Sequence, residues 1–525
     1  MNADSSVHRS RVDARQRASA NGQETMQAEP DSRRWLALVV LSLAQLMIAL
    51  DATVMNIALP SAQADLGFSN ADRQWVITGY TLAFGGLLLL GGRIADQFGR
   101  QRAFLIGLLG FAAASAVGGA ATNLVTLIGA RAAQGAFAAL LAPTVLSALA
   151  VTFTEPRERA RAFAIFGAIA GGGGAVGLIV GGLLTDGLSW RWCLYVNAPI
   201  AVVAAVGGWL LLTRDHPPRA AHLDLPGALL ATGGLVAVVY ACSQVATRGW
   251  GSILVVGFLV GAAGLLTLFV IRESWADAPL LPLRILQDRN RVGAYLVVAG
   301  AVAGMLALFL FLTYYLQVVL RFSPIKAGLA FLPLSVAVFV SSQLVAARLL
   351  IVPGLLLAAA AMLLLTRLTV SDAYVRLVMP AEVLIGLGLG CVFVPAISTA
   401  TQRVDRTDAG VAAAAVNTSQ QIGGSLGVAV LNTVAGRATA RYLSAHQGMP
   451  GAGAAALVHG YTVAAAWAAG ILAVTALVAG MLITAASARP QPEPTSHTDP
   501  PLAAPSDGTS SLSMRTKGVV TDEPR

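Results

Sequence analysis

The stretch Gly92-Arg-Ile-Ala-Asp-Gln-Phe-Gly-Arg-Gln-Arg102 is a short polar turn between two long apolar runs. Its two glycines, Gly92 and Gly99, permit a turn and a close approach of neighbouring backbones. Its arginines are typical of loops on the cytoplasmic side of a membrane. Asp96 can accept hydrogen bonds from the N-terminus of a neighbouring helix, where the helix dipole favours negative charge. The stretch predicts either a polar contact between neighbouring helices or an ordinary basic loop.

The composition of the whole chain predicts a helical membrane protein. Hydrophobic residues make up 56% of its 525 residues, charged residues make up only 12%, and the mean hydropathy is +0.71. Soluble domains contain about 25% charged residues. A helix needs about 20 apolar residues to cross a bilayer. We therefore expect an all-α polytopic membrane protein with fourteen spans, near 35–58, 75–92, 103–122, 125–150, 161–185, 192–213, 225–245, 252–271, 292–319, 327–348, 351–368, 377–400, 408–434 and 460–486.

The positions of the basic residues predict the orientation of these spans. If the N-terminus lies inside the cell, 25 of the 35 Lys and Arg residues fall on cytoplasmic segments and 9 fall on outer loops. Membrane proteins show this bias toward the inner side. Both termini should then be cytoplasmic, in a multi-pass protein of the plasma membrane. The net charge of +9 follows from the same bias, so nucleic acid is not expected as a partner.

The segments outside the spans carry little chemistry. The tails, 1–34 and 488–525, are rich in polar residues and Pro, and we expect them to be disordered. The three cysteines have none of the paired spacing of metal sites, so we expect no metal and no cofactor. The chain also lacks a nucleotide-binding loop and the Gly-x-Ser-x-Gly elbow of hydrolases. A membrane-embedded enzyme is therefore the least favoured function, and no catalytic residue is assigned.

Four motifs together resemble a known transporter family. They are the turn at 92–102, Leu50-Asp-Ala-Thr-Val-Met-Asn-Ile-Ala-Leu-Pro60, Leu127-Ile-Gly-Ala-Arg-Ala-Ala-Gln-Gly135, and Trp190-Arg-Trp192 with Asn197-Ala-Pro199. The chain resembles the drug:proton antiporter branch of the major facilitator superfamily that has fourteen spans. In that family the turn forms a cytoplasmic latch that stabilises the outward-facing state. The resemblance carries this role to the matching residues Gly92, Arg93, Asp96, Gly99 and Arg100.

The resemblance also implies an architecture and a function. We expect two six-helix halves, 35–213 and 291–487, separated by two extra helices and linkers at 214–290. Asp224 is expected to cap the first extra helix. The implied activity is export of lipophilic drugs or antibiotics in exchange for protons, by a protein that is embedded in the lipid bilayer as a monomer.

The fifth span departs from the antiporter pattern. Its motif glycines recur at a spacing of four and provide smooth faces for helix packing: Gly173, Gly177, Gly181 and Gly182. Leu178 stands where the family has Pro, which removes a potential kink. This departure favours the alternative of a proton-coupled uptake symporter. The turn between the tenth and eleventh spans is also shortened, and we expect Pro353-Gly354 to join these two helices.

Asp51 is the principal candidate for proton coupling, because a carboxylate at bilayer depth costs roughly 2.5 to 3.5 kcal/mol. Arg131 is its expected partner, and Gln134 shares a helix face with Arg131. If both charged groups face a central cavity, a change in their separation would make Asp51 accept or release a proton. The alternative is a static ion pair that locks the helices together.

Further polar and aromatic residues are candidates for a substrate cavity. Glu382 can serve a cationic substrate or another proton, or can lie at the membrane interface. Asn417, Gln420 and Gln421 share a face of their helix and should contact protein or water, either across helices or in a cavity. Tyr314 and Tyr315, with Phe311, are expected to share another face, as a wall for an amphipathic ligand or as ordinary packing.

Overall fold

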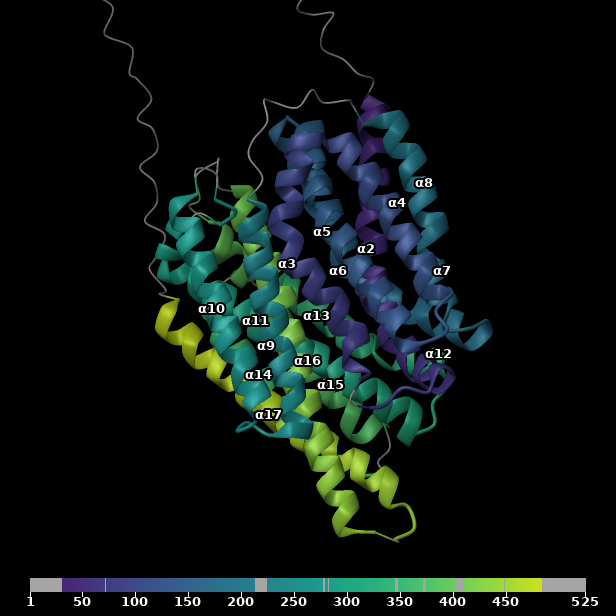
Figure 1. Ribbon diagram of the computed structural model, residues 1–525. Coiled ribbons are helices and arrows are strands. Elements are labelled where there is room, and N and C mark those ends of the chain that lie inside the picture. The colour runs from purple at the N-terminus through teal and green to yellow at the C-terminus, as the bar shows by residue number, and fades with distance from the viewer. Residues whose placement is uncertain are drawn as a thin grey trace, which may run out of the picture. The chain divides into compact units, whose positions relative to one another are not determined.

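The computed structural model describes residues 31–70, 72–212, 224–276, 279–281, 283–344, 348–371, 374–402, 404, 409–447 and 449–483. Both expected tails lie outside these ranges, except that the first helix begins at Asp31 and not near Trp35. Regular structure in the described ranges is entirely helical (Figure 1): α2 (Asp31–Leu66), α3 (Gln74–Phe98), α4 (Arg100–Gly119), α5 (Leu124–Thr152), α6 (Pro156–Gly187), α7 (Trp192–Tyr195), α8 (Asn197–Leu211), α9 (Leu225–Arg248), α10 (Ile253–Trp275), η1 (Leu283–Gln287), α11 (Arg289–Tyr314), η2 (Tyr315–Val319), α12 (Pro324–Ala330), α13 (Leu332–Leu344), η3 (Arg348–Leu350), α14 (Ile351–Leu365), α15 (Tyr374–Thr401), α16 (Ala409–Ala445) and α17 (Ala452–Leu482).

Side chains before several of the helices accept a hydrogen bond from a free N–H group of the first turn. Asn123 accepts a hydrogen bond from Thr126 N at the start of α5, and Asp288 accepts one from Asn290 N at the start of α11. Asp224 accepts from Gly227 N, which confirms the expected cap of α9. Such caps stabilise a helix by about 1 kcal/mol each. The chain thus marks its helix starts locally.

The expected count of fourteen spans is not confirmed. Among the described residues, twelve helices are long and apolar enough to cross a bilayer. The helix at the expected eleventh span, α14, has 15 residues and is about 22 Å long, which is shorter than a hydrocarbon core of about 30 Å. The helix at the expected thirteenth span, α16, has 37 residues but carries amides, hydroxyls and arginines that lower its hydropathy.

The helices have two sets of ends, which we name after landmark residues. The Gly99 face contains the turn between α3 and α4, and the Trp190 face contains the connection between α6 and α7. Following the expected division of the chain, we call α2 to α8 the N-terminal half and α11 to α17 the C-terminal half. Helix α9 packs against α3 and α16, and α10 packs against α9, so the extra pair bridges both halves.

The hydrogen bonds seen between the two halves lie from the middle of the helices to the Trp190 face. Near that face, Tyr314 donates to Gln63 Oε1 at 2.5 Å, and Gln317 donates to Ile57 O at 2.9 Å. In the middle of α3 and α16, the hydroxyls of Thr81 and Ser425 lie 2.7 Å apart. The two halves are therefore joined on the Trp190 side.

Candidate proton and substrate sites

Asp51 lies in the middle of α2 and is the centre of a buried polar cluster. It is 1% exposed, as is Arg131 on α5. Arg131 Nη1 donates to Asp51 Oδ2 at 2.6 Å, and Gln134 Nε2 donates to Asp51 Oδ1 at 3.0 Å. The expected pairing of Asp51 with Arg131 is present in this structure. The side chains are enclosed by protein and do not face an open cavity here.

Asn197, at the start of α8, completes the cluster, although sequence reasoning placed it only in a family motif. Its Nδ2 donates to Asp51 Oδ1 at 2.8 Å, and its side chain is fully buried. Asp51 thus accepts from three donors on two helices, which is the environment of an ionised carboxylate. Asn197 begins a helix directly after a Trp-rich turn. This position is the sequence signal that could have marked Asn197 as a functional residue.

Arg131 connects this cluster to a helix that touches the other half. Its Nε donates to Val76 O on α3 at 3.2 Å, and its guanidinium carbon lies 4.4 Å from the centre of the Tyr80 ring. Helix α3 also carries Thr81, which contacts α16. A change in the position of Arg131 would therefore act directly on the helix that joins the halves.

The glycines of α6 bring that helix onto the segment of α2 that carries Asp51. A Cβ on Gly177 would lie 2.1 Å from Thr53 Oγ1 and 2.9 Å from Leu50 O, and one on Gly181 would lie 3.0 Å from Val54 O. Gly173 similarly faces Ala49. The predicted packing role of these three glycines is thus visible. The α-helix continues through Leu178, where the resembled motif has Pro.

Gly182 lies where α6 of the N-terminal half contacts α12 of the C-terminal half. A Cβ there would lie 2.7 Å from Ile325 Cα on α12, and a Cβ on Gly328 of α12 would lie 2.4 Å from Leu178 O. Glycines on both helices thus allow α6 and α12 to cross closely near the Trp190 face.

The turn predicted at 92–102 is much shorter in the structure, because α3 continues to Phe98 and α4 begins at Arg100, which leaves only Gly99 between them. Gly99 adopts φ 85° between α3 and α4, a conformation that favours glycine. Arg93 Nη2 donates to Pro279 O in the connection before α11, and Arg100 Nε donates to Ser147 Oγ on α5. The side chain of Asp96 lies outside the described part of the structure. The latch role of these residues stays a prediction.

The geometry can now be compared with known proteins. A family model described as Major Facilitator Superfamily matches residues 41–428. The chain belongs to the major facilitator superfamily. It is 55% identical to the puromycin resistance protein pur8 of Streptomyces alboniger over 86% of this chain and 92% of that protein. It is 41% identical to the cephamycin export protein CmcT of Amycolatopsis lactamdurans over 77% of this chain and 85% of that protein.

Solved structures support the fold of this major facilitator protein. A bacterial homolog to the human lysosomal transporter Spinster, in an inward-facing and unoccupied conformation, has a TM-score of 0.62 and 16% identity, over 87% of this chain and 98% of that chain. The family match and the relatives named as resistance and export proteins make the protein a multi-pass membrane transporter of the drug-efflux branch, and not an enzyme.

Glu382 of this facilitator is completely buried on α15. The Tyr374 hydroxyl lies 2.6 Å from Ala330 O and 3.0 Å from Glu382 Oε2. Glu382 Oε1 has no partner among the described residues. A functional role for Glu382 stays a prediction.

Phe311 and Tyr315 line one cavity, whereas Tyr314 does not, which corrects the expectation that all three share a face. Tyr314 points toward α2 and bonds Gln63, whereas Tyr315 bonds Thr369 O on the other side. The α-helix changes to a π-helix at Tyr315, so helical spacing no longer predicts the direction of the next side chain.

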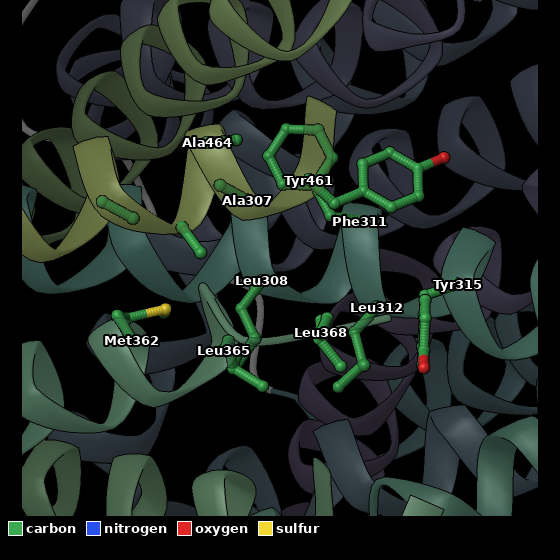
Figure 2. Close-up of a pocket in the computed structure, with 12 residues that line it drawn as sticks. Ala307, Leu308, Phe311, Leu312, Tyr315, Met362, Leu365, Leu368, Tyr461 and Ala464 are labelled. Carbon is green, nitrogen blue, oxygen red and sulfur yellow. The ribbon is translucent and has the colours of Figure 1, made fainter. Parts of the chain in front are cut away.

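Tyr315 instead lines a small apolar cavity between α11, α14 and α17. Figure 2 shows the rings of Phe311 and Tyr461 on one side of this cavity and Met362 and Leu365 on the other. Its volume of about 30 Å³ is far below the roughly 300 to 1,000 Å³ of drug-sized sites. In this arrangement the cavity cannot hold a drug.

The polar stripe of α16 lies at the contact with α3. A Cβ on Gly85 would lie 2.6 Å from Gln421 Cβ, so Gln421 packs between helices. Asn417 Nδ2 lies 3.5 Å from Ala413 O of its own helix, and Asn417 and Gln420 are half-buried. Helix packing is therefore observed for Gln421, while a substrate contact stays a prediction for all three.

The connection between α13 and α14 differs from the expected Pro-Gly turn. Pro353 and Gly354 lie within the first turns of α14, which begins at Ile351. Pro is tolerated in a first helical turn because its missing N–H would have no partner there. Gly354 allows close packing, since its Cβ would lie 2.7 Å from Gly388 O on α15.

Proposed function

We propose that this transporter exports lipophilic antibiotics or drugs across the plasma membrane in exchange for protons. The observation that carries the proposal is the buried carboxylate of Asp51, which is paired with Arg131. The chain is also 55% identical over 464 residues to a puromycin resistance protein. The protein would act as a monomer without a cofactor, with both termini in the cytoplasm.

The contacts between the halves support a defined step of this cycle. The hydrogen bonds join the halves on the Trp190 side, which is the outer side if the termini are cytoplasmic. The structure would then represent a state closed to the outside. In this state Asp51 has released its proton and is paired with Arg131.

The next step depends on where the partners of Asp51 lie. Its donors Arg131, Gln134 and Asn197 all belong to the N-terminal half, so rocking of rigid halves alone would not separate the ion pair. We infer that a proton on Asp51 releases Arg131, which then weakens its bond to Val76 O and shifts α3 against α16. Proton binding would thereby favour the other arrangement of the halves.

The proton gradient provides enough free energy for this exchange. A potential of 100 mV supplies about 2.3 kcal/mol per charge moved. Because each tenfold concentration ratio costs about 1.4 kcal/mol, one proton supports a substrate gradient of roughly 40-fold.

Everted membrane vesicles with an acidic interior test the proposal. Addition of puromycin, cephamycin or another exported compound should dissipate the pH difference, and Asp51→Asn should abolish this response while the protein remains in the membrane. Release of substrate together with protons would instead support the uptake symporter. An unchanged response in Asp51→Asn would show that coupling uses another group.

A further inference from the structure

A second cavity lies at the Trp190 face, away from the Asp51 cluster. Its volume is about 660 Å³, and residues of the α2–α3 connection, α3, α9, α16 and α17 line it. This volume falls within the range of small-molecule sites, roughly 300 to 1,000 Å³. The cavity touches both halves of the transporter.

The charged groups of this cavity all have one sign. Arg73, Arg437 and Arg441 are among its sixteen lining residues, and none of those residues is Asp or Glu. Amides and hydroxyls form much of the remaining wall, including Gln74 and Asn432. Such a lining provides donors for an anion with no repelling carboxylate among the residues that form it.

Arg73 is the buried member of this set, with 3% exposure. Its Nε donates to Asn432 Oδ1 at 3.2 Å, and its guanidinium carbon lies 4.1 Å from the centre of the Tyr314 ring. Stacking on a ring leaves the edge of a guanidinium free to donate in its plane. The Nη1 of Arg73 has no partner among the described residues.

Tyr461 has a second unused donor at the same cavity. Its ring lies 5.9 Å from the guanidinium carbon of Arg73, and its hydroxyl has no partner among the described residues. A buried donor without a partner is energetically unfavourable. A ligand that accepts from Arg73 and Tyr461 would remove this cost.

We propose that this cavity binds the anionic group of a small molecule, a carboxylate, sulfonate or phosphate, with Arg73 as its principal donor. Because Arg73 belongs to the N-terminal half and Tyr461 to the C-terminal half, the bound anion connects the halves. It therefore stabilises the arrangement in which the Trp190 side is closed. The proposal requires neither a proton gradient nor a direction of transport.

The binding test compares two probes of similar shape and different charge. The full-length protein in phosphatidylcholine nanodiscs is titrated with benzenesulfonate or with neutral benzenesulfonamide by calorimetry, without a gradient. We expect saturable binding of the sulfonate and at least tenfold weaker binding of the sulfonamide, because hydrogen bonds to an ionised acceptor are about twice as strong. Equal binding of both probes, or no binding of the sulfonate, overturns the proposal.

A matched pair of variants places a charge in the cavity without a clash. Gly436 lines the cavity, and a Cβ added there meets nothing within 4 Å. Gly436→Asp should lower the affinity for benzenesulfonate at least tenfold through repulsion, whereas Gly436→Asn should retain it. Equal affinities of these two variants would contradict the site.

Arg73→Gln identifies the donor, with Arg191→Gln as its control on the same face. Arg191 pairs with Asp65 at 2.9 Å and does not line the cavity. We expect loss of sulfonate binding only in Arg73→Gln, and retained binding there would exclude Arg73 as the donor. If Arg73→Gln does not fold, the Gly436 pair still decides whether the cavity binds an anion.

Nanodiscs that contain phosphatidylglycerol identify the source of the anion. Competition between this lipid and benzenesulfonate would assign the cavity to a lipid headgroup. Unchanged sulfonate binding would assign it to a soluble anion, and either result agrees with the proposed chemistry. Failure of the vesicle experiment on proton exchange would leave these binding results unaffected.

Discussion

At the scale of single residues, Asp51 and Arg131 can serve stability, coupling or both. Each is 1% exposed, and their closest atoms are 2.6 Å apart. Removal of one partner of a buried ion pair costs about 3 to 5 kcal/mol, whereas replacement of both is often nearly neutral. Stability and coupling can therefore be separated by a double variant.

We expect Arg131→Gln to lower the thermal stability of the purified protein more than Asp51→Asn/Arg131→Gln does, because only the single variant leaves a charge unpaired. Melting curves in detergent check this order. The double variant should fold yet show no drug-induced proton flux in vesicles. Restored flux in the double variant would mean that the pair only locks the helices.

Glu382 offers a second prediction at this scale. The Tyr374 hydroxyl has one proton, and its closer neighbour is Ala330 O at 2.6 Å. The same hydroxyl can donate to Glu382 Oε2 at 3.0 Å, and a proton on Glu382 would allow both contacts to be hydrogen bonds at once. We expect an infrared carbonyl band of a protonated carboxyl group that disappears in Glu382→Gln and persists in Tyr374→Phe. An identical spectrum for wild type and Glu382→Gln would show that Glu382 is ionised.

At the scale of elements, glycines determine how closely helices of different halves approach. Gly328 on α12 meets the Leu178 carbonyl, so an added methyl group would clash with backbone. We expect Gly328→Ala to disfavour the arrangement closed on the Trp190 side. Spin labels at Gly187→Cys and Ser444→Cys, without the native cysteines, should then report an additional longer distance.

Gly167→Ala is the matched control for this prediction, because a Cβ at Gly167 meets nothing within 4 Å. Its distance distribution should equal that of the parent protein. If Gly328→Ala also leaves the distribution unchanged, the crossing of α6 and α12 does not limit closure.

Local sequence predicted the positions of most helices. It did not predict side-chain directions or partners that depend on contacts between helices. Apolar length located helices at the expected spans, and the spacing of Gly173, Gly177 and Gly181 predicted a packing face that lies against α2. The direction of Tyr315 was not predictable, because the α-helix changes to a π-helix at this residue. The partnership of Asn197 with Asp51 links positions 146 residues apart, which local patterns do not encode.

At the scale of the whole molecule, the positions of the basic residues predict the topology. A fluorescent protein fused after Arg525 should fluoresce in the cytoplasm, and alkaline phosphatase inserted after Val370 should be active outside. The second result requires that α14 crosses the bilayer despite its 15 residues. Inactive phosphatase at Val370 would exclude a crossing by α14, and a fusion at Arg525 without fluorescence would contradict a cytoplasmic C-terminus.

The glycine contact between α6 and α2 also has a consequence for how this exporter can evolve. A Cβ atom at Gly177 or Gly181 would clash with the backbone of α2 beside Asp51. Substitutions that adapt the transporter to new compounds should therefore not occur at these two glycines. Saturation mutagenesis under drug selection should leave these positions unchanged while more open glycines such as Gly167 accept many residues. The breadth of resistance would then be set by surfaces away from the proposed proton site.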